Sequence, residues 1–443
     1  MTLTGIEIYK YLPKTNCAEC AIPTCLAFAM NVAAGKLALE KCPYLSKEIR
    51  VTLTDASAPP VRPVNFGTGD FLVKLGNDGV LYRHEKRFEN PTALGLLLSS
   101  NDSPNQIDAQ IESFKQNRYE RMGSSLHADY FYVEDSEKTD PSAFVELAQK
   151  ASLHGALMLC TSLPSTLEKA LEKVAIHKPL IGSAGTENLD LFAALAIKYQ
   201  LPLALIVTST AQATLLSQKA QNLGVKDLVF SVGAASMREA LHLCIEIRTK
   251  AIVDKNKFLG FPTILYPCAF TADLKEETLL ATVLMAKYAS GVVLSNFKAE
   301  TLYPLLTARQ NIYTDPQRPL TMPSGIYPIG NPTPDSPVIL SCNFSLTYYI
   351  VSAEIGNSAV PAYFIIKDTE GLSVLTAWAA GKFSADSIAA FVKKSGISEK
   401  VNHRRLIVPG FISVESGALE EALGNWQVIV GPTNAADLPA FLK

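Results

Sequence analysis

Short apolar runs alternate with amphipathic stretches over most of the chain between residues 64 and 315. The apolar runs have the length of buried strands, and the amphipathic stretches have the period of helices. A strand-then-helix order implies parallel strands, and about eight such units in about 250 residues predict a TIM (β/α)8 barrel. An open, doubly wound sheet is the alternative. Strands are expected at residues 71–75, 129–133, 156–160, 179–181, 203–208, 228–232, 263–266 and 291–294, and helices at 141–152, 165–176, 188–200, 210–223, 236–254 and 274–290.

The same rhythm restarts after residues 315–337, a segment with seven prolines that predicts a linker. The pattern beyond it predicts a small open α/β sheet of the Rossmann-like kind. Its strands are expected at residues 338–342, 362–366, 405–408 and 427–430, and its helices at 346–355, 372–380, 386–394 and 417–424.

Each of these C-terminal strands runs directly into a polar or glycine-bearing turn. The turns are residues 341–347, 367–373, 409–412 and 431–434. Ligands of open α/β sheets bind at such carboxyl edges, where glycines and small hydroxyls let a large flat ligand approach the backbone. One such turn is ordinary, because every α/β loop needs caps, but four together favour a ligand site. The chain has neither a G-x-G-x-x-G nor a P-loop motif, which argues against nucleotide ligands.

The strand ends of the predicted barrel carry small polar residues at 161–162, 208–209 and 233–234, and Asn296. A small-molecule site in such a barrel would lie at these ends. This set contains no carboxylate pair and no lysine that would mark an acid–base pocket. We therefore expect the barrel to serve mainly as a scaffold or docking surface.

Half of the eight cysteines lie within the first 42 residues, with the spacing C-x2-C-x4-C-x16-C. Clustered thiols in an intracellular chain favour metal ligation over disulfides. Structural zinc is usually held by two C-x2-4-C pairs, whereas a closing Cys-Pro occurs in ferredoxin sequences. The pattern favours a [4Fe-4S] cluster over zinc and over free buried thiols. A helix at residues 25–41 would bring the fourth cysteine back to the loop. The four proposed ligands are Cys17, Cys20, Cys25 and Cys42.

Composition narrows the class of protein further. The chain has 443 residues, 48% hydrophobic and 19% charged residues, and a net charge of −2. This predicts a core-rich α/β multidomain protein without a general nucleic-acid surface. The sequence shows no membrane span and no signal peptide, so a cytoplasmic location is expected. With a second proline-containing linker at residues 55–63, the predicted domains are 1–57, 64–315 and 325–443.

Two segments resemble a known family. The opening LTGIEIYKYLPKTNCAECAIPTCLAFAMNVAAGK…CPY and the later KDTEGLSVLTAWAAGKF are similar to the large (gamma) subunit of the corrinoid/iron–sulfur protein of the reductive acetyl-CoA (Wood–Ljungdahl) pathway. Relatives often carry glycine where this chain has Ala18 and Ala21, but the cysteine spacing is unchanged. The resemblance implies a [4Fe-4S] module, a TIM barrel and a C-terminal cobalamin-binding domain.

The resemblance also implies a methyl-carrier function in carbon fixation. Cobalt(I) of the corrinoid would accept a methyl group from methyltetrahydrofolate through a separate methyltransferase. It would donate that methyl group to acetyl-CoA synthase/CO dehydrogenase, and the cluster would serve the reductive reactivation of cobalt(II). The implied partners are a smaller subunit, which forms a heterodimer with this chain, and a reductive activator. No catalytic residue is assigned, because the chain acts as the carrier component of a methyltransferase system.

The chain has no D-x-H-x-x-G motif, whose histidine ligates cobalt in many cobalamin enzymes, and His403 is the only histidine after residue 242. We therefore expect base-off cobalamin without a protein histidine on cobalt. Cys342 is a tempting cobalt ligand, but a thiol at a strand end more often serves packing. The expected corrinoid contacts are Asn343, Thr347, Glu370, Gly371, Leu372, Ser373, Val374, Leu375, Thr376, Gly431, Pro432, Thr433 and Asn434.

Two other functions compete with this one. The first is a cluster-dependent electron-transfer protein whose C-terminal domain docks a partner and binds no corrinoid. The second is a barrel methyltransferase that itself binds a pterin, which the sparse acid–base residues at the barrel strand ends disfavour.

Overall fold

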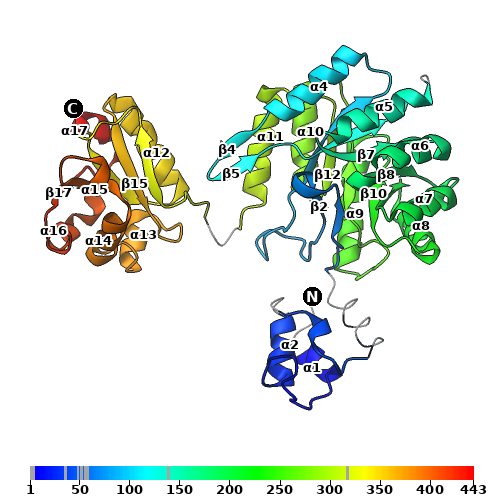
Figure 1. The fold of residues 1–443 in the computed structure, drawn as a ribbon, viewed down its shortest axis with the longest axis horizontal. Helices are drawn as coiled ribbons and strands as arrows, with labels where there is room; N and C mark the ends of the chain where they lie inside the picture. Colours follow the sequence, from blue (N-terminus) through cyan, green and yellow to red (C-terminus); the bar gives the residue numbers. More distant parts are fainter. Residues whose placement is uncertain are drawn as a thin grey trace. The chain divides into compact units, whose positions relative to one another are not determined.

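The computed structural model describes residues 5–33, 37–46, 49, 53, 59–136, 140–315 and 319–443. Contacts divide the chain into two compact units, coloured along the chain in Figure 1. One comprises Met1–Tyr119 and Leu126–Tyr313, and the other comprises Glu120–Ser125 and Thr314–Lys443. Every helix among the described residues is too short or too polar to cross a lipid bilayer.

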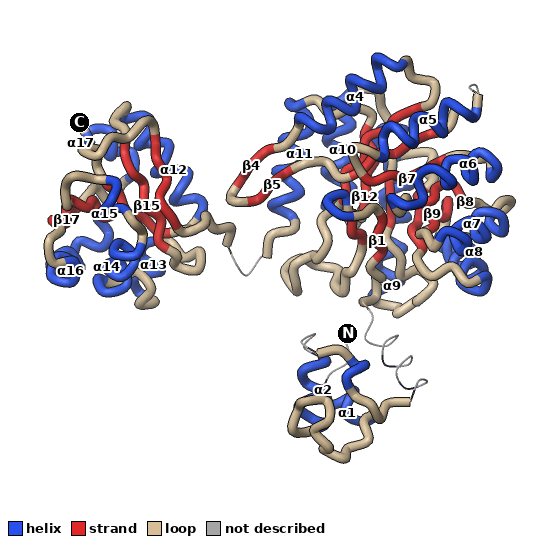
Figure 2. The backbone as a smooth tube through the Cα atoms, in the orientation of Figure 1, coloured by secondary structure: helices blue, strands red, loops and turns tan. Residues whose placement is uncertain are grey.

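The larger unit contains a closed barrel of parallel strands, which confirms the predicted TIM barrel over the open sheet. Figure 2 shows the strands in red with the blue helices outside them. The strands are β3 (Ala93–Ser99), β6 (Tyr130–Glu134), β7 (Ala156–Cys160), β8 (Leu180–Ala184), β9 (Leu203–Val207), β10 (Leu228–Val232), β11 (Thr263–Leu265) and β12 (Gly291–Leu294). The helices are α4 (Pro104–Gln116), α5 (Pro141–Ser152), α6 (Pro164–Val174), α7 (Leu189–Tyr199), α8 (Thr210–Leu223), α9 (Met237–Ile252), α10 (Leu274–Ala286) and α11 (Ala299–Ile312), with short 3-10 turns η3 (Ala175–His177) and η4 (Pro267–Ala269).

The barrel helices begin where the sequence supplies a cap. A side-chain oxygen of the residue before the helix accepts a backbone N–H of the first turn in α4, α5, α8, α9 and α10. This bond satisfies a donor that the helix itself cannot pair. The capping residues are Ser103, Asp140, Ser209, Ser236 and Asp273.

The prediction for the first barrel strand is wrong. Residues 71–75 do not enter the barrel, because β2 (Val73–Leu75) pairs antiparallel with β1 (Val64–Phe66), following the turn η2 (Gly69–Phe71). This β-hairpin buries its apolar side chains against the barrel interior, where Phe66 meets Tyr130 edge to face at 5.4 Å. The first strand of the barrel along the sequence is instead β3, a leucine-rich run that pairs with β12 and β6.

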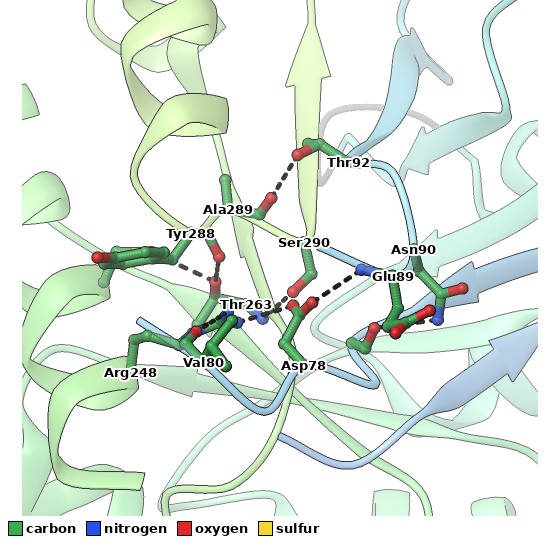
Figure 3. A network of polar contacts seen from close by, with 12 residues as sticks. Asp78, Val80, Glu89, Asn90, Thr92, Arg248, Thr263, Tyr288, Ala289 and Ser290 are labelled. Carbon is green, nitrogen blue, oxygen red and sulfur yellow. Dashed lines mark hydrogen bonds and ion pairs between the residues drawn. The ribbon is translucent and has the colours of Figure 1, made fainter. Parts of the chain in front are cut away.

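A buried ion pair holds the segment after β2 to the barrel (Figure 3). Arg248 of α9 donates to the Asp78 carboxylate at 2.7 Å and to the Val80 carbonyl oxygen at 2.8 Å. Both charged side chains are at least nine-tenths buried. The guanidinium also lies over the rings of Phe88 and Tyr288, which adds cation–π attraction.

The C-terminal unit is built on a five-stranded sheet in the order β13-β15-β14-β16-β17. Strand β13 runs antiparallel to its neighbour, and the other pairs are parallel. The strands are β13 (Gly325–Ile329), β14 (Val338–Cys342), β15 (Ala362–Lys367), β16 (Arg405–Val408) and β17 (Gln427–Val430). The helices are α12 (Ser345–Ser358), α13 (Val374–Ala379), α14 (Ala385–Lys394), α15 (Ile397–Lys400), α16 (Ser416–Leu423) and α17 (Leu438–Leu442), with turns η5 (Gly410–Glu415) and η6 (Ala435–Asp437).

Strand β13 corrects the prediction that residues 315–337 form only a linker. Its Pro328 removes one backbone donor, which a strand at the sheet edge tolerates. The two faces of the sheet bury separate cores: Leu340 and its alternate neighbours pack under α13, α14 and α16, whereas Ile339 packs on the α12 side. A short hairpin pairs β4 (Tyr119–Arg121) with β5 (Ser124–Leu126), and its residues 120–125 are assigned to the second unit.

The N-terminal module contains α1 (Gly5–Tyr11), α2 (Cys25–Ala33) and the turn η1 (Leu39–Lys41). The helix predicted at residues 25–41 is present as far as Ala33. Residues 34–36 lie outside the described residues, and a separate 3-10 turn precedes Cys42. Residues 55–58 of the linker predicted at 55–63 also lie outside the described part of the chain. The described remainder is fixed to the larger unit, because Val61 pairs with Asp78 and the Arg62 backbone N–H donates to the Gly260 carbonyl oxygen.

Arg248→Ala is expected to lower the free energy of unfolding by about 3–5 kcal/mol, because it leaves the buried Asp78 carboxylate without its charged partner. Denaturant unfolding followed by far-ultraviolet circular dichroism measures this change. Lys198→Ala is the matched control, because Lys198 forms an exposed pair with Glu168 and its loss should leave the free energy of unfolding nearly unchanged. Equal effects of the two variants would contradict a structural role for the buried pair.

Candidate functional site

The four N-terminal cysteines line one pocket. Cys17 and Cys20 come from the loop before α2, Cys25 is the first residue of that helix, and Cys42 follows η1. Apolar side chains including Leu12 and Phe28 close the remaining walls. The structure therefore brings together all four residues proposed as ligands. Among the described residues, no group of three or more His, Cys, Asp or Glu side chains is arranged to hold a single metal ion.

The loop that carries these thiols has an unusual backbone. Asn16, Ala18 and Ala21 have φ angles of +49°, +59° and +61°, a left-handed region that residues other than glycine rarely occupy. The Asn16 side chain stabilises this course by accepting the Cys25 backbone N–H at 2.8 Å. The repeated left-handed turns direct the chain around the pocket.

A side-chain hydrogen bond spans the two cysteine segments. The Tyr44 hydroxyl donates to Glu19 at 2.6 Å, and this bond, together with the negative charges of Glu19 and nearby thiolates, raises the Tyr44 pKa. The bond links the residues around Cys17 and Cys20 to the segment that supplies Cys42.

A second pocket, of about 260 Å³, lies at the carboxyl edge of the C-terminal sheet. Its wall is mainly apolar and comes from strands β14 and β16, helix α12, the start of α13 and the loop after β17. Large apolar side chains such as Ile350, Leu375 and Phe411 remain exposed at its rim. It contains these predicted contact residues: Thr347, Ser373, Val374, Leu375, Gly431, Pro432 and Thr433.

Other predicted contact residues lie elsewhere along this edge. Asn343, Glu370 and Leu372 line a neighbouring, more polar hollow, in which Glu370 pairs with Lys382. Gly371 is buried, and a Cβ atom there would approach the Thr321 side chain to 2.8 Å. Glu370, Gly371 and Leu372 lie in the loop between β15 and α13, and Asn343 lies beside that loop. None of the four lines the apolar pocket.

The two remaining predicted residues have hydrogen-bond partners within the protein. The Thr376 hydroxyl lies 3.0 Å from that of Ser373 in the first turn of α13. The Asn434 side chain accepts the Ala436 backbone N–H at 3.2 Å, which caps η6.

The structure places the two candidate cobalt ligands away from the pocket wall. Cys342 is fully buried in the core under α13 and α14. His403 precedes β16 at its amino end, where one ring nitrogen lies 2.9 Å from the Ser336 carbonyl oxygen and the other accepts the Arg405 backbone N–H.

Comparison with known proteins identifies the family. A family model described as CO dehydrogenase/acetyl-CoA synthase delta subunit matches residues 63–442, and a model for an Fe-S cluster segment matches residues 12–44. The corrinoid/iron-sulfur protein large subunit of Moorella thermoacetica is 41% identical over 100% of this chain and 99% of its own. The chain belongs to the corrinoid/iron-sulfur protein large-subunit family. The resemblance seen in the sequence is therefore confirmed.

Archaeal relatives extend the same family. The acetyl-CoA decarbonylase/synthase complex subunit gamma of Methanothermobacter thermautotrophicus is 33% identical over 100% of this chain and 99% of its own. The corresponding subunit of Methanocaldococcus jannaschii is 30% identical over 100% and 96%. This member of the large-subunit family is thus similar to its relatives along their whole length.

The set of expected contacts left out several residues that line the apolar pocket. Pro409 and Phe411 lie in the turn at residues 409–412, which the sequence pattern indicated as part of a ligand edge, but they were not named as contacts. Ala435 and Leu438 follow the loop after β17 and were not indicated at all. Leu438 comes from a terminal helix that no local pattern indicated.

The barrel of this large-subunit family member also has a polar cavity at the carboxyl ends of its strands. A cavity of about 540 Å³ beyond β6–β8 is lined by Glu134, Asp135 and Glu187. Asp135 accepts the Thr161 hydroxyl at 2.7 Å, and burial raises the pKa of Glu134. The expectation that these strand ends lack a carboxylate pair is wrong, because the expected strand stopped at residue 133. These carboxylates remove the reason for disfavouring a pterin site there, and that hypothesis stays a prediction.

Ala18→Gly is expected to stabilise the N-terminal module by about 1 kcal/mol, because glycine adopts the left-handed backbone without a steric clash. Hydrogen exchange of the α2 amides in the anaerobically purified protein should slow by about fivefold. Ala27→Gly is the matched control: Ala27 lies inside α2, where glycine costs about 1 kcal/mol. Faster exchange in both variants would contradict strain at Ala18.

Proposed function

We propose that this chain is the methyl-carrying subunit of a corrinoid/iron–sulfur protein, with a [4Fe-4S] cluster in its N-terminal module and base-off cobalamin on its C-terminal sheet. The observation that carries this proposal is the apolar pocket at the carboxyl edge, which gathers residues that follow four separate strands, β14, β15, β16 and β17. The family to which the chain belongs supports the same ligand.

The edge suits a large, flat and partly apolar ligand. Ile350, Leu375 and Phe411 are each at least 46% exposed, an amount of apolar surface that normally marks a binding site. Small residues such as Gly431 and Ser373 leave the backbone accessible beside them. We infer that the pocket between these groups receives the nucleotide base that is detached from the metal in the base-off form. The bound corrinoid would supply the metal that carries the methyl group.

Among the described residues, those that line this pocket include no histidine and no cysteine. His403 lies at the amino end of β16, and Cys342 is inside the core. The Ser373 and Thr376 hydroxyls, which contact each other, are the groups that we propose would face the lower side of the ring. A hydroxyl is a weaker donor than imidazole, so this arrangement favours the reduced state of low coordination number that a methyl acceptor needs.

The thiol pocket suits an iron–sulfur cluster. Four cysteine thiols line it, which is the ligand set of a [4Fe-4S] centre, and Pro43 follows the last of them as in ferredoxins. When bound, this centre would supply electrons for reactivation of the cobalt. The chain's own contribution is to hold the thiols, exclude water with Leu12 and Phe28, and close the pocket through the Glu19–Tyr44 bond.

The proposed partners follow from this role. A carrier must meet a methyltetrahydrofolate-dependent methyltransferase, acetyl-CoA synthase/CO dehydrogenase and a reductive activator in turn. We also propose a smaller subunit as the heterodimer partner. The exposed apolar groups around the edge, among them Trp378 and Val414, give such partners a surface to contact.

Anaerobic purification of the chain with its smaller subunit tests the cobalt site. Wild-type complex should contain about one cobalt, with the visible absorption of a corrinoid, and about four iron atoms. Leu375→Asp should weaken cobalamin binding by about tenfold or more, because it places a charge in the apolar wall. Leu215→Asp, at an exposed leucine of the barrel helix α8, is the control and should retain cobalt. A wild-type complex without cobalt would instead support the electron-transfer protein.

Cys42→Ser separates the cluster from the methyl transfer. The variant should lose most of its cluster absorbance and its reductive reactivation, whereas methyl transfer with chemically reduced cobalt should continue. Cys244→Ser is the control, because Cys244 is buried in the barrel and contacts Thr263. Failure of methyl transfer itself in folded Cys42→Ser protein would show that the cluster has more than a reactivation role.

A further inference from the structure

The loop between β15 and α13 turns around one buried side chain, that of Asn343. This residue follows β14 directly and is 4% exposed. Its side-chain oxygen accepts the backbone N–H of Thr369 at 2.9 Å and that of Gly371 at 3.0 Å. Its side-chain nitrogen donates to Asp368 Oδ1 at 2.8 Å. The oxygen also accepts the Thr369 hydroxyl at 2.8 Å and so has no capacity left for a ligand. The nitrogen uses one of its two N–H donors, and the side chain is too buried to offer the other freely.

Asp368 completes the arrangement from the loop itself. The same Oδ1 atom that accepts the Asn343 amide also accepts the Glu370 backbone N–H at 2.9 Å. Together, Asn343 and Asp368 bind the three consecutive backbone N–H groups of residues 369–371. These groups consequently point toward the inside of the loop.

The bonds hold a backbone that would not form by local preference. Glu370 and Gly371 have φ angles of +57° and +79°, and the left-handed conformation is unfavourable for glutamate because its Cβ atom crowds the backbone. Strained backbone of this kind persists where the surroundings over-determine it, and it gathers at ligand sites. Two residues later the chain reaches Ser373, which opens α13 and lines the apolar pocket.

We propose that Asn343 is a positioning residue for the corrinoid and not a contact residue. It fixes the turn at residues 368–372, and through that turn it sets the position of Ser373–Thr376 under the ring. This inference rests on the proposed corrinoid site. In this inference, Asn343 and Asp368 together hold the turn, and they can do so only when an amide on one side chain donates to an oxygen on the other.

The pairing makes an exchange of the two side chains possible. In Asn343→Asp, a carboxylate would face the Asp368 carboxylate, and the repulsion should open the turn. In Asp368→Asn, the retained oxygen can still accept from Asn343 and Glu370, so this variant should be nearly neutral. In the double variant, the amide introduced at position 368 can donate to the carboxylate introduced at position 343, which still accepts the N–H groups of Thr369 and Gly371. The Glu370 N–H then loses the oxygen that it shares with Asn343, so the double variant should recover only part of the loss.

The experiment measures two properties of the anaerobic heterodimer. Hydrogen exchange reports on the amides of residues 369–371 without dependence on the corrinoid. Cobalamin affinity and the electron paramagnetic resonance spectrum of cobalt(II) report on the lower face. Asn343→Asp should speed exchange and weaken cobalamin binding by about tenfold each, with an altered spectrum, and the added Asp368→Asn substitution should restore part of both losses. A purely structural role would leave the spectrum of the bound corrinoid unchanged.

The outcomes separate this inference from the proposed function. Wild-type complex without cobalt would remove the corrinoid site itself, whatever the exchange data show. Wild-type complex with cobalt, combined with normal affinity and an unchanged spectrum in Asn343→Asp, would refute the positioning role alone. Loss of binding in Asn343→Asp that Asp368→Asn does not restore would also refute it, because the loss would then come from a direct contact or from general unfolding.

Discussion

Parallel strand pairing is the constraint on which the rest of this structure depends. It brings the carboxyl ends of strands that are far apart in sequence to one edge, so loops that share no local pattern become neighbours. In the C-terminal unit this places Thr347, Ser373 and Gly431 around one pocket. In the barrel it places Glu134 and Glu187 around another. The C-terminal pocket and the barrel cavity therefore both exist because the chain alternates strand and helix. Neither cavity could be built from a single sequence motif.

The edge of the C-terminal sheet shows how polar loops can produce an apolar site. Asn343, Asp368 and Thr369 are polar, but their hydrogen bonds are made to one another and to the loop backbone. Asn343 and Thr369 are buried and offer a ligand little polar surface, whereas Asp368 is exposed in the neighbouring polar hollow. The surface left for a ligand is then set by Leu375, Phe411 and Ile350, which remain exposed. A site of this kind selects a ligand by shape and apolar area, and it leaves the chemistry to the ligand.

Sequence patterns predicted most of the fold because buried strands and amphipathic helices have distinct periods. They located the loops at the strand ends better than they assigned roles to individual side chains in those loops. Strands β14, β16 and β17 lie where the pattern predicts them. The prolines of residues 315–337, Pro328 among them, suggested a linker. Pro328 nevertheless lies in a strand, because an edge strand can accept a proline that a central strand cannot. Residues 73–75 have the composition of a barrel strand, and only the tertiary fold pairs them outside it. Asn343 was correctly placed at the sheet edge, but its partners, residues 368–371, are more than twenty positions away. The cysteines were easier to interpret because four thiols at short spacing have few uses other than holding a metal centre.

The turn at residues 368–372 and the N-terminal cysteine loop differ in what keeps their left-handed backbone in place. Glu370 is held by Asp368, and the adjacent Gly371 by Asn343, inside a sheet that has its own hydrophobic core. That turn is formed before any ligand arrives. Ala18 and Ala21 occupy the same left-handed region in a module whose small core includes two of the cysteines themselves, Cys25 and Cys42. A core that small contributes little folding energy, so the geometry of that loop depends on a centre that ties the thiols together. The turn beside the proposed corrinoid pocket is thus preorganised by the protein, whereas the cysteine loop would be organised jointly by the protein and the proposed metal centre.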